Sequence, residues 1–291
     1  MDIPTYPKSA PLSLRMKDAY LAKAKKSPLL VSDVSFVNLF GWDSLRHYRL
    51  SRLNENIVIK ATYGSHEAFL PPIGSFRLQE TLARLLEDTG LLIHMTRRHV
   101  RRLRHHAVKA TFDRDNADYL FLHDTLVHLP GKAFINRRRL YNYFTRTYGP
   151  VYRPLTPGLI RYVRSFEEQW YENNRERIND PHLHAEHEAA LAVLDNYNRF
   201  DLLGGVIMIQ DEIKGYIIGE ELNPLTLLTH FEKCDLNYRG MFPALFLHFC
   251  SQHPYKYVNM MQDLGVKNLR HAKLLYRPDY FLKKYIITKK P

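Results

Sequence analysis

Two carboxylates in the C-terminal part of the chain stand where expected strands end, so their side chains are candidates for acid–base chemistry. Glu232 ends an expected strand over residues 225–233, and Asp263 follows another over residues 257–260. Two carboxylates at the mouth of one cleft can serve as a general base and as the group that orients it. Burial would then raise the pKa of one of them toward the working pH. The alternative is that Glu232 only pairs with a neighbouring cation such as Lys233.

Three cations follow the second of these strands. Arg270, Lys273 and Lys284 could grip the phosphates or a carboxylate of a ligand. Pairing with nearby acids, Asp263 among them, is an equally good interpretation. Tyr276 lies between these cations and could donate a proton to a leaving group, although an aromatic residue in such a segment is more often part of the core. The sequence thus leaves substrate binding and structural ion pairing open at this site.

The net charge suggests that one half of the chain meets a polyanion. Lys and Arg number 42 against 30 Asp and Glu, which gives a formal net charge of +12. Residues 1–150 hold 24 of these cations and 13 of the acids, whereas residues 151–291 hold 18 and 17. A tRNA, a phosphate-bearing donor or an anionic lipid surface would fit the positive half, and the alternative is a well-solvated face. The arginines that would contact RNA phosphates are Arg97, Arg98, Arg101, Arg102, Arg104, Arg137, Arg138 and Arg139.

Composition and cysteine content predict a cytoplasmic globular protein. Hydrophobic residues make up 45% and charged residues 25%, which is ample for a core and unlike a disordered chain. Two cysteines cannot form a disulfide framework, no apolar run approaches the ~18 residues of a membrane span, and the N-terminus lacks the features of a signal peptide. His182, His184 and His187 have a metal-like spacing, but no cysteine or carboxylate cluster completes the set, so no metal is expected.

The expected elements form two similar series, which predicts an α+β fold with mixed, mostly antiparallel sheets flanked by helices. Residues 1–157 and 158–291 are the expected domains, with Asp180 as an N-cap and Pro181 as the first residue of a helix in the second. The first series has strands at 53–61, 66–70, 91–95, 119–122 and 151–157 and helices at 14–26, 78–89, 96–106 and 131–148. The second has helices at 159–178, 180–200, 238–252 and 269–274 and strands at 204–210, 214–220, 225–233, 257–260 and 281–288.

The C-terminal stretch resembles the catalytic C-terminal family of phosphatidylglycerol lysyltransferases. The resemblance is carried by the segments 257–265, 269–278 and 283–285, which share that family's order of Asn, Asp, Gly, Leu-Arg, Ala-Lys, Tyr, Pro and Lys-Tyr. Upstream residues follow the same order, so the resemblance extends from about residue 30 to 287. It implies two tandem GNAT-like domains, a basic one over 1–157 and one over 158–291 that carries the signature.

The resemblance also implies transfer of an activated acyl or aminoacyl group to an amine or hydroxyl acceptor. In GNAT-like domains a splayed pair of central strands holds the donor, and here the gap would fall between strands 225–233 and 257–260. The residues expected to act in catalysis are Glu232, Asp263 and Tyr276. The residues expected to hold substrate or donor are Asn259, Arg270, Lys273, Lys284, Arg137 and Arg138.

The donor is expected to be aminoacyl-tRNA or acyl-CoA, and no tightly bound cofactor is expected. An Arg/Gln-x-x-Gly-x-Gly pyrophosphate loop is missing before the helix at 238–252, where Tyr238-Arg239-Gly240 is only a remnant. This absence favours aminoacyl-tRNA over acyl-CoA.

Two other functions compete with the transferase. The family usually has charged residues where Met260 and Met261 stand and a small hydroxyl residue at Leu275. These departures suggest a non-catalytic module that binds tRNA or another anion and has lost the site chemistry. The chain also lacks the multi-span membrane region of true lipid lysyltransferases, which argues against lipid as the acceptor. The third interpretation is a peripheral membrane protein that uses its basic half to contact anionic lipid.

Overall fold

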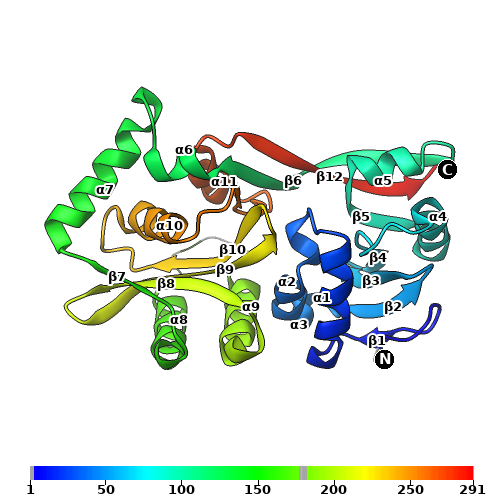
Figure 1. Cartoon of the computed structure of the whole chain (residues 1–291), viewed down its shortest axis with the longest axis horizontal. Helices are drawn as coiled ribbons and strands as arrows, with labels where there is room; N and C mark the ends of the chain where they lie inside the picture. Colours follow the sequence, from blue (N-terminus) through cyan, green and yellow to red (C-terminus); the bar gives the residue numbers. More distant parts are fainter. Residues whose placement is uncertain (1–2, 177, 179–181, 291) are drawn as a thin grey trace. The chain divides into compact units, whose positions relative to one another are not determined.

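The computed structural model describes residues 3–176, 178 and 182–290, and the expected cap at Asp180 and Pro181 lies outside them. It confirms the α+β class: mostly antiparallel strands form sheets that helices flank (Figure 1).

Contacts divide the chain into two compact units that do not follow the order of the chain. Unit 1 consists of residues 1–118, 262–265 and 281–291, and unit 2 of residues 119–261 and 266–280. Residues 119–157, expected in the N-terminal domain, thus make their contacts within unit 2. The expected domain boundary at residue 157 stays a prediction.

Unit 1 contains a sheet with the strand order β1-β2-β3-β4-β5-β12-β6, of which β6 contributes its first part. Its strands are β1 (Ala10–Pro11), β2 (Arg49–Leu53), β3 (Asn56–Tyr63), β4 (His66–Phe69), β5 (Leu91–Thr96), β6 (Val108–Leu122) and β12 (Tyr280–Lys289). Its helices are α1 (Lys17–Lys26), α2 (Phe36–Gly41), α3 (Asp43–Arg46), α4 (Leu78–Thr89) and α5 (Arg97–Arg102).

The leucines of α4 explain how this helix packs. Leu82, Leu85 and Leu86 recur at helical spacing and are buried against Val58 of β3 and Leu92 of β5. The helix ends at Gly90, whose φ of 71° lies in the left-handed region that glycine adopts without strain. The chain then returns directly into β5, which runs parallel to β4.

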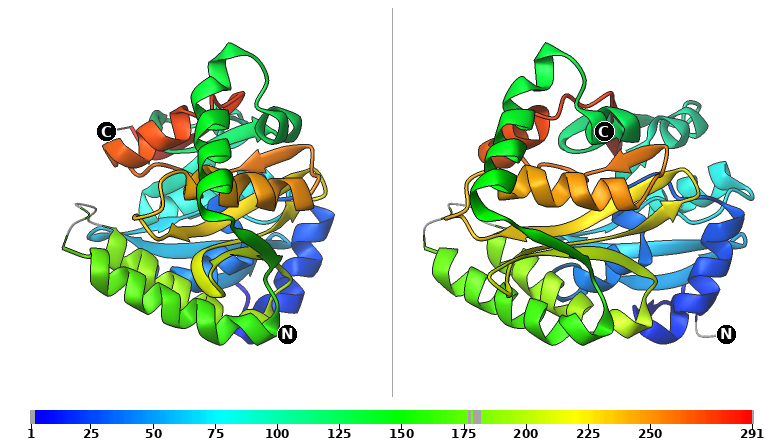
Figure 2. Two further views of the ribbon diagram at one scale, coloured as in Figure 1. Left: turned by 90° about the vertical axis from the view of Figure 1, so that its left-hand side faces the viewer. Right: turned by 60° about the vertical axis from the view of Figure 1, so that its left-hand side comes forward.

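Unit 2 contains the strand order β6-β11-β10-β9-β8-β7, to which β6 contributes its last residues. Its other strands are β7 (Val151–Pro154), β8 (Leu202–Ile209), β9 (Glu212–Asn223), β10 (Thr226–Cys234) and β11 (Tyr257–Asn259). Its helices are α6 (His123–His128), α7 (Ile135–Tyr148), α8 (Ile160–Asn174), α9 (Leu183–Asp195), α10 (Met241–Gln252) and α11 (Lys267–Leu274). Figure 2 shows α8 and α9 on one face of this sheet and α10, crossed by α7, on the other.

Helix α10 is mostly apolar, and most of its residues are buried. Leu245, Phe246 and Phe249 are buried in one cluster with Ile217 of β9 and Leu227 of β10. A helix with so wide an apolar surface belongs in a core. It connects β10 to β11, which run parallel, as a crossover between parallel strands requires.

The observed elements match the expected ones closely in the second series and less well in the first. Strand β6 begins at Val108, eleven residues before the expected start, because its first part is polar and carries no apolar alternation. Strand β2 was not expected, and α5 ends at Arg102 rather than continuing to residue 106.

Candidate active site

Strands β10 and β11 separate after a short parallel ladder. Their paired residues run from Thr226 with Tyr257 to Leu228 with Asn259, and no further pair follows, although β10 continues to Cys234. Beyond the ladder, the hydroxyl of Thr229 donates to the carbonyl oxygen of Asn259 at 3.4 Å.

The segment after β11 forms its backbone hydrogen bonds with β6 and not with β10. The N–H of Met260 donates to the carbonyl oxygen of Tyr119 at 3.0 Å, and the N–H of Tyr119 donates to that of Met261 at 3.1 Å. The two central strands of unit 2 are therefore splayed, as the resemblance predicts.

A β-bulge in β10 decides where Glu232 points. The register with β9 shifts between Thr229 and Phe231, so His230 is the extra residue. Leu227 and Cys234 both join the cluster around α10, although an odd number of steps separates them and strict alternation would place them on opposite faces. The bulge therefore turns Glu232, two residues before Cys234, toward the α10 face.

Glu232 carries a buried carboxyl oxygen without a partner. The residue as a whole is half-buried, but its Oε1 is shielded from solvent and has no hydrogen bond among the described residues. Burial raises the pKa of Glu232 to about 8, and the charges of Arg137, Lys273 and Lys233 offset only part of that effect. A carboxyl group that titrates near neutral pH is suited to act as a general base.

Arg137 and Tyr276 lie together beside this carboxyl group. The Arg137 guanidinium of α7 lies over the Tyr276 ring, 4.2 Å from its centroid, and donates to the carbonyl oxygen of Ala272 at 3.3 Å. Burial raises the pKa of Tyr276 well above its ordinary value, the charge of Arg137 lowers it, and the carboxyl of Glu232 raises it further.

Lys273 adds a second cation, from α11. It is buried, with its Nζ 5.8 Å from the centroid of the Tyr119 ring. Four of the predicted site residues, Glu232, Arg137, Lys273 and Tyr276, thus come together in unit 2.

The remaining predicted residues of unit 2 have structural surroundings. Asn259 is fully buried, and its Oδ1 accepts from the N–H of Met261 at 2.7 Å, which shapes the turn after β11. Arg138 donates to the carbonyl oxygens of Leu129 and Gly131 and so closes the loop before α7. Arg270 is half-buried on α11.

Lys284 lies in unit 1, inside a buried charge cluster that the sequence did not reveal. Its Nζ is 2.6 Å from Oδ1 of Asp118 and pairs also with Asp33, and all three side chains are buried. The carboxylates raise the pKa of Lys284 against the opposing effect of burial. Asp33 pairs in addition with His94 at 2.8 Å. Burial alone would raise the pKa of Asp33, but the charges of His94 and Lys284 hold it well below its usual range.

Asp263, expected beside Glu232, also belongs to unit 1 and has a structural partner there. Its fully buried carboxylate accepts from Arg114 at 3.0 Å and from the N–H of Gly265 at 2.9 Å. These bonds hold the short segment 262–265 against β6.

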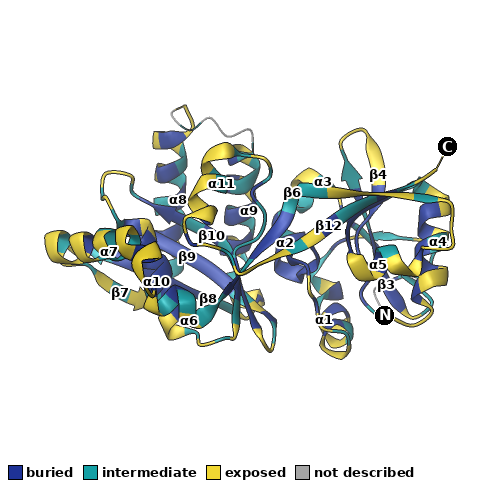
Figure 3. Ribbon diagram, turned by 90° about the horizontal axis from the view of Figure 1, so that it is seen from above, coloured by how far each residue is buried: buried dark blue, intermediate teal, exposed yellow. Residues whose placement is uncertain are grey.

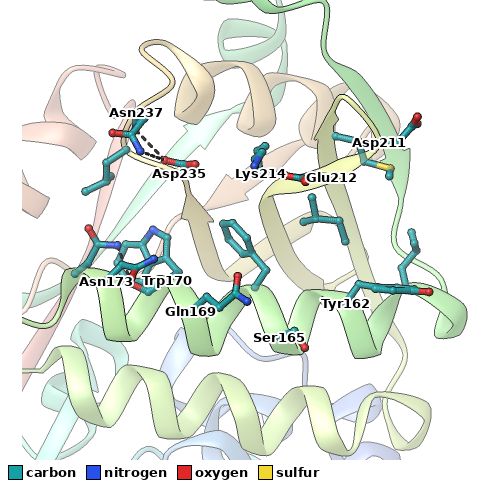
Figure 4. Close-up of a pocket in the computed structure, with 16 residues that line it drawn as sticks. Tyr162, Ser165, Gln169, Trp170, Asn173, Asp211, Glu212, Lys214, Asp235 and Asn237 are labelled. Carbon is teal, nitrogen blue, oxygen red and sulfur yellow. Dashed lines mark hydrogen bonds and ion pairs between the residues drawn. The ribbon is translucent and has the colours of Figure 1, made fainter.

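A cavity of about 790 Å³ lies on the opposite face of the sheet of unit 2 from α10. Figure 4 shows Tyr162, Gln169 and Trp170 of α8 on one side of it and Lys214, Asp235 and Asn237 on the other. No predicted site residue lines it. The indole N–H of Trp170 donates to the carbonyl oxygen of Cys234 at 2.7 Å and thereby anchors α8 to the end of β10.

Helix α7 covers the beginning of α10, where a helix N-terminus would otherwise be free to bind a phosphate. Gly240, with a φ of 93°, is the N-cap of α10, and a Cβ there would lie 2.5 Å from the carbonyl oxygen of Leu140 in α7. The Tyr148 ring of α7 packs against Tyr238 with 5.0 Å between centroids.

Metal-binding clusters and membrane-spanning helices are both missing from the part of the chain that the structure describes. No three histidine, cysteine or carboxylate side chains gather there as a metal ion would require. None of the helices in the same part combines the length and the apolarity needed to span a bilayer.

Comparisons with known proteins identify the family to which the chain belongs. The family model "Phosphatidylglycerol lysyltransferase, C-terminal" matches residues 26–288, whereas no curated protein matches the sequence. A conserved protein of unknown function from Bacteroides thetaiotaomicron has a similar structure, with a TM-score of 0.90, 28% identity, and coverage of 97% of this chain and 99% of that one.

Two further structures share the fold at low identity. The C-terminal domain of a proposed lysylphosphatidylglycerol synthetase from Agrobacterium fabrum has a TM-score of 0.69 and 10% identity, over 96% of this chain and 92% of that one. L-PGS from Bacillus licheniformis has a TM-score of 0.67 and 14% identity, over 100% of this chain and 94% of that one. Since the family model spans most of the sequence, the chain belongs to the phosphatidylglycerol lysyltransferase C-terminal family.

Proposed function

We propose that the protein is an aminoacyltransferase that moves an aminoacyl group from aminoacyl-tRNA to an amine or hydroxyl acceptor at the gap between β10 and β11. The observation that carries this proposal is the buried, unpartnered carboxyl of Glu232 beside splayed strands in a member of this family. Structural carboxylates of a core are paired, as Asp263 is, so an unpaired one beside a gap needs a functional reason.

The residues beside the gap would each act at one step of the acyl transfer. Glu232 takes the proton from the acceptor while the acceptor atom attacks the ester carbonyl of the donor. Backbone N–H groups of β10 on the side that β11 has left donate to the oxyanion that forms. The ester C–O bond then breaks, and the proton held by Glu232 passes to the departing ribose oxygen, which the hydroxyl of Tyr276 hydrogen-bonds.

Arg137 and Lys273 supply the positive charge that a phosphate-bearing donor requires. Both act on the Glu232 carboxyl, so both lie near enough to influence a ligand bound there. They also keep the pKa of Glu232 lower than burial alone would set it, which leaves part of the carboxyl ionised at neutral pH.

The packing of α7 favours tRNA over coenzyme A as the source of the acyl group. An acyl-CoA donor would need the amides at the beginning of α10 for its pyrophosphate, and Leu140 of α7 lies against Gly240 at that point. An aminoacyl ester at the end of a tRNA makes no such demand on α10.

Single-turnover transfer from charged tRNAs tests the proposal. The purified chain would be incubated with labelled aminoacyl-tRNA or acyl-CoA and with amine, hydroxyl and phosphatidylglycerol acceptors. We expect transfer from at least one aminoacyl-tRNA and a fall of about a hundredfold or more in Glu232→Gln, because a general base contributes that much. Glu188→Gln, on the exposed surface of α9, is the matched control.

Two outcomes would contradict the proposal. Transfer from acyl-CoA but from no aminoacyl-tRNA would show that the donor is acyl-CoA. Tight tRNA binding without turnover, with the same tRNA affinity in Glu232→Gln, would instead identify the non-catalytic binding module.

A further inference from the structure

One face of unit 1 carries alternating aromatic and cationic side chains along the paired strands β6 and β12. On β12, Phe281, Lys283 and Tyr285 alternate with the buried Lys284, so the three share the opposite face from Lys284. Phe281 is 38% exposed, and Phe112 of β6 is 41% exposed. Two large aromatic rings are therefore open to solvent on one stretch of sheet.

Contacts across the two strands hold these rings between cations. Lys283 Nζ lies 5.5 Å from the Phe112 centroid, and the Phe112 and Tyr285 rings are 6.0 Å apart. The Arg114 guanidinium lies 4.9 Å from the Phe281 centroid. We name the surface formed by Phe112, Arg114, Phe281, Lys283 and Tyr285 the aromatic ribbon.

The arginines of α5 border the same face. Tyr285 pairs with Met95 of β5, and Met95 belongs to the apolar cluster that also receives Val100 and Leu103. Because Val100 and Leu103 point into that cluster, the helix turns its other side to solvent (Figure 3). That side carries Arg97, Arg98, Arg101 and Arg102, all exposed, and none of them forms an ion pair with a described residue.

Apart from the buried Asp263, which pairs with Arg114, acidic residues are kept away from this face. The sequence has no Asp or Glu from residue 89 to residue 112 or from residue 280 to its end. Asp113 and Asp115 alternate with Phe112 and Arg114 along β6, so they project from the other side of the strand. Unit 1 as a whole holds 23 Lys and Arg against 13 Asp and Glu, whereas unit 2 holds 19 against 17.

We infer that the aromatic ribbon and the α5 arginines form an RNA-binding surface on which unpaired nucleotides stack on Phe112 and Phe281 while Lys283 and the arginines neutralise phosphates. Exposed rings on a strand pair, set between cations, are how proteins hold single-stranded nucleic acid without reading its sequence. Arginine also suits phosphate better than lysine, because its planar fork makes paired hydrogen bonds.

An anionic membrane fits this face less well than RNA. A helix that lies in a bilayer needs an apolar side free to insert, but the apolar side of α5 is already packed in the core of unit 1. The inference rests on the proposed function only in naming tRNA as the natural RNA. The surface itself would bind any RNA with unpaired nucleotides.

Binding of uncharged RNA tests this inference without any turnover. Fluorescence anisotropy would be recorded with uncharged tRNA and with an oligouridine of about 12 nucleotides over a range of salt concentrations. Phe112→Ala with Phe281→Ala should weaken oligouridine binding about tenfold or more and leave the salt slope unchanged. Arg101→Gln with Arg102→Gln should weaken binding of both RNAs and lower the salt slope by about two.

The control removes the same charge elsewhere in unit 1. Lys25 and Lys26 are exposed on α1, and changing both to Gln should leave RNA binding unchanged. Thermal melting would verify that every variant is folded. Wild-type RNA affinity in both test variants would overturn the inference. Binding to phosphatidylglycerol vesicles would also be measured, and its loss in the arginine variant with RNA binding intact would overturn the inference as well. Since no acyl transfer is measured, failure of the transferase proposal would leave this result interpretable.

Discussion

Each unit has a pair of parallel strands that separate after a short ladder. The pair is β4 and β5 in unit 1 and β10 and β11 in unit 2. The charged residues beside the two openings differ. In unit 1, β5 continues past its single pair with β4 into His94, whose φ of 55° is unusual for a strand residue, and His94 contacts the paired charges of Asp33 and Lys284. In unit 2, β10 continues past its ladder into a bulge and then Glu232, whose Oε1 has no partner among the described residues.

The difference is between a buried charge that is paired and a buried carboxyl group that is not. Lys284 has two carboxylates within reach, so its charge is compensated and no proton is available at neutral pH. Glu232 has only the more distant charges of Arg137, Lys273 and Lys233, and burial brings its pKa close to neutral. The charges beside one opening are therefore paired, whereas the carboxyl group beside the other has no partner among the described residues.

Replacing the buried Lys284 of unit 1 should have the largest effect, and the effect is on stability. Lys284→Met leaves Asp118 buried without its cation and Asp33 with His94 alone, and breaking a buried pair in this way costs about 3–5 kcal/mol. Urea denaturation would measure the loss, with Lys283→Met on the exposed face as the control. A variant that also carries Asp33→Asn and Asp118→Asn should recover much of the lost stability. An unchanged midpoint in Lys284→Met would show that the cluster does not stabilise unit 1.

Neutralising Glu232 should stabilise the protein increasingly as the pH rises from about 4.5 to about 8. The folded-state pKa is raised from 4.5 to about 8, so the folded state prefers the protonated form and loses stability as the pH rises between those values. Glu232→Gln should thus match the wild type near pH 4.5 and exceed it above pH 8 by about 2 kcal/mol, after allowing for partial exposure. Denaturation midpoints at the two pH values measure this. Equal stability at both would mean that Glu232 is well solvated.

Removing the charge of Arg137 should move the pH dependence of the reaction. The guanidinium lowers the pKa of Glu232, so Arg137→Gln should shift the rise of the transfer rate with pH upward by about one unit. A pH–rate profile under single-turnover conditions is the measurement, and Arg139→Gln, on the exposed side of α7, serves as the control. If the rate falls at every pH without a shift, Arg137 binds the donor but does not tune the base.

The smallest effect is expected at Tyr276. Tyr276→Phe keeps the ring against Phe121, Phe246 and Arg137, so stability should hardly change. Loss of one hydrogen bond to the departing oxygen should lower the transfer rate about fivefold. An unchanged rate would assign Tyr276 to the core.

Local sequence patterns predicted most of unit 2. Apolar spacing and turn residues marked β8 to β11 and α8 to α11 within a few residues, and the end of the expected strand at 225–233 marked Glu232 as a candidate for acid–base chemistry. The bulge that aims Glu232 at the α10 face had no sequence signal, because His230 interrupts neither the length nor the apolar character of the strand. The splay itself was expected from the family resemblance and not from the residues.

Long-range pairing explains what the sequence could not predict. Lys284 and Asp118 are 166 positions apart, and Asp263 lies 149 positions from its partner Arg114, so no local pattern connects them. Asp263 and Lys284 were expected beside Glu232 because both follow the strand expected at 257–260. The chain instead places segments 262–265 and 281–291 in unit 1.

The titration of the Glu232 side chain would show whether this residue is a buried base. Carboxyl carbon chemical shifts of isotope-labelled protein would be followed across the pH range, and Glu232→Gln would identify the signal. We predict one glutamate signal that titrates near pH 8 and is missing from the variant. If the signal lost in Glu232→Gln titrates near 4.5, the ordinary value, then Glu232 is not a buried base and the proposed mechanism fails.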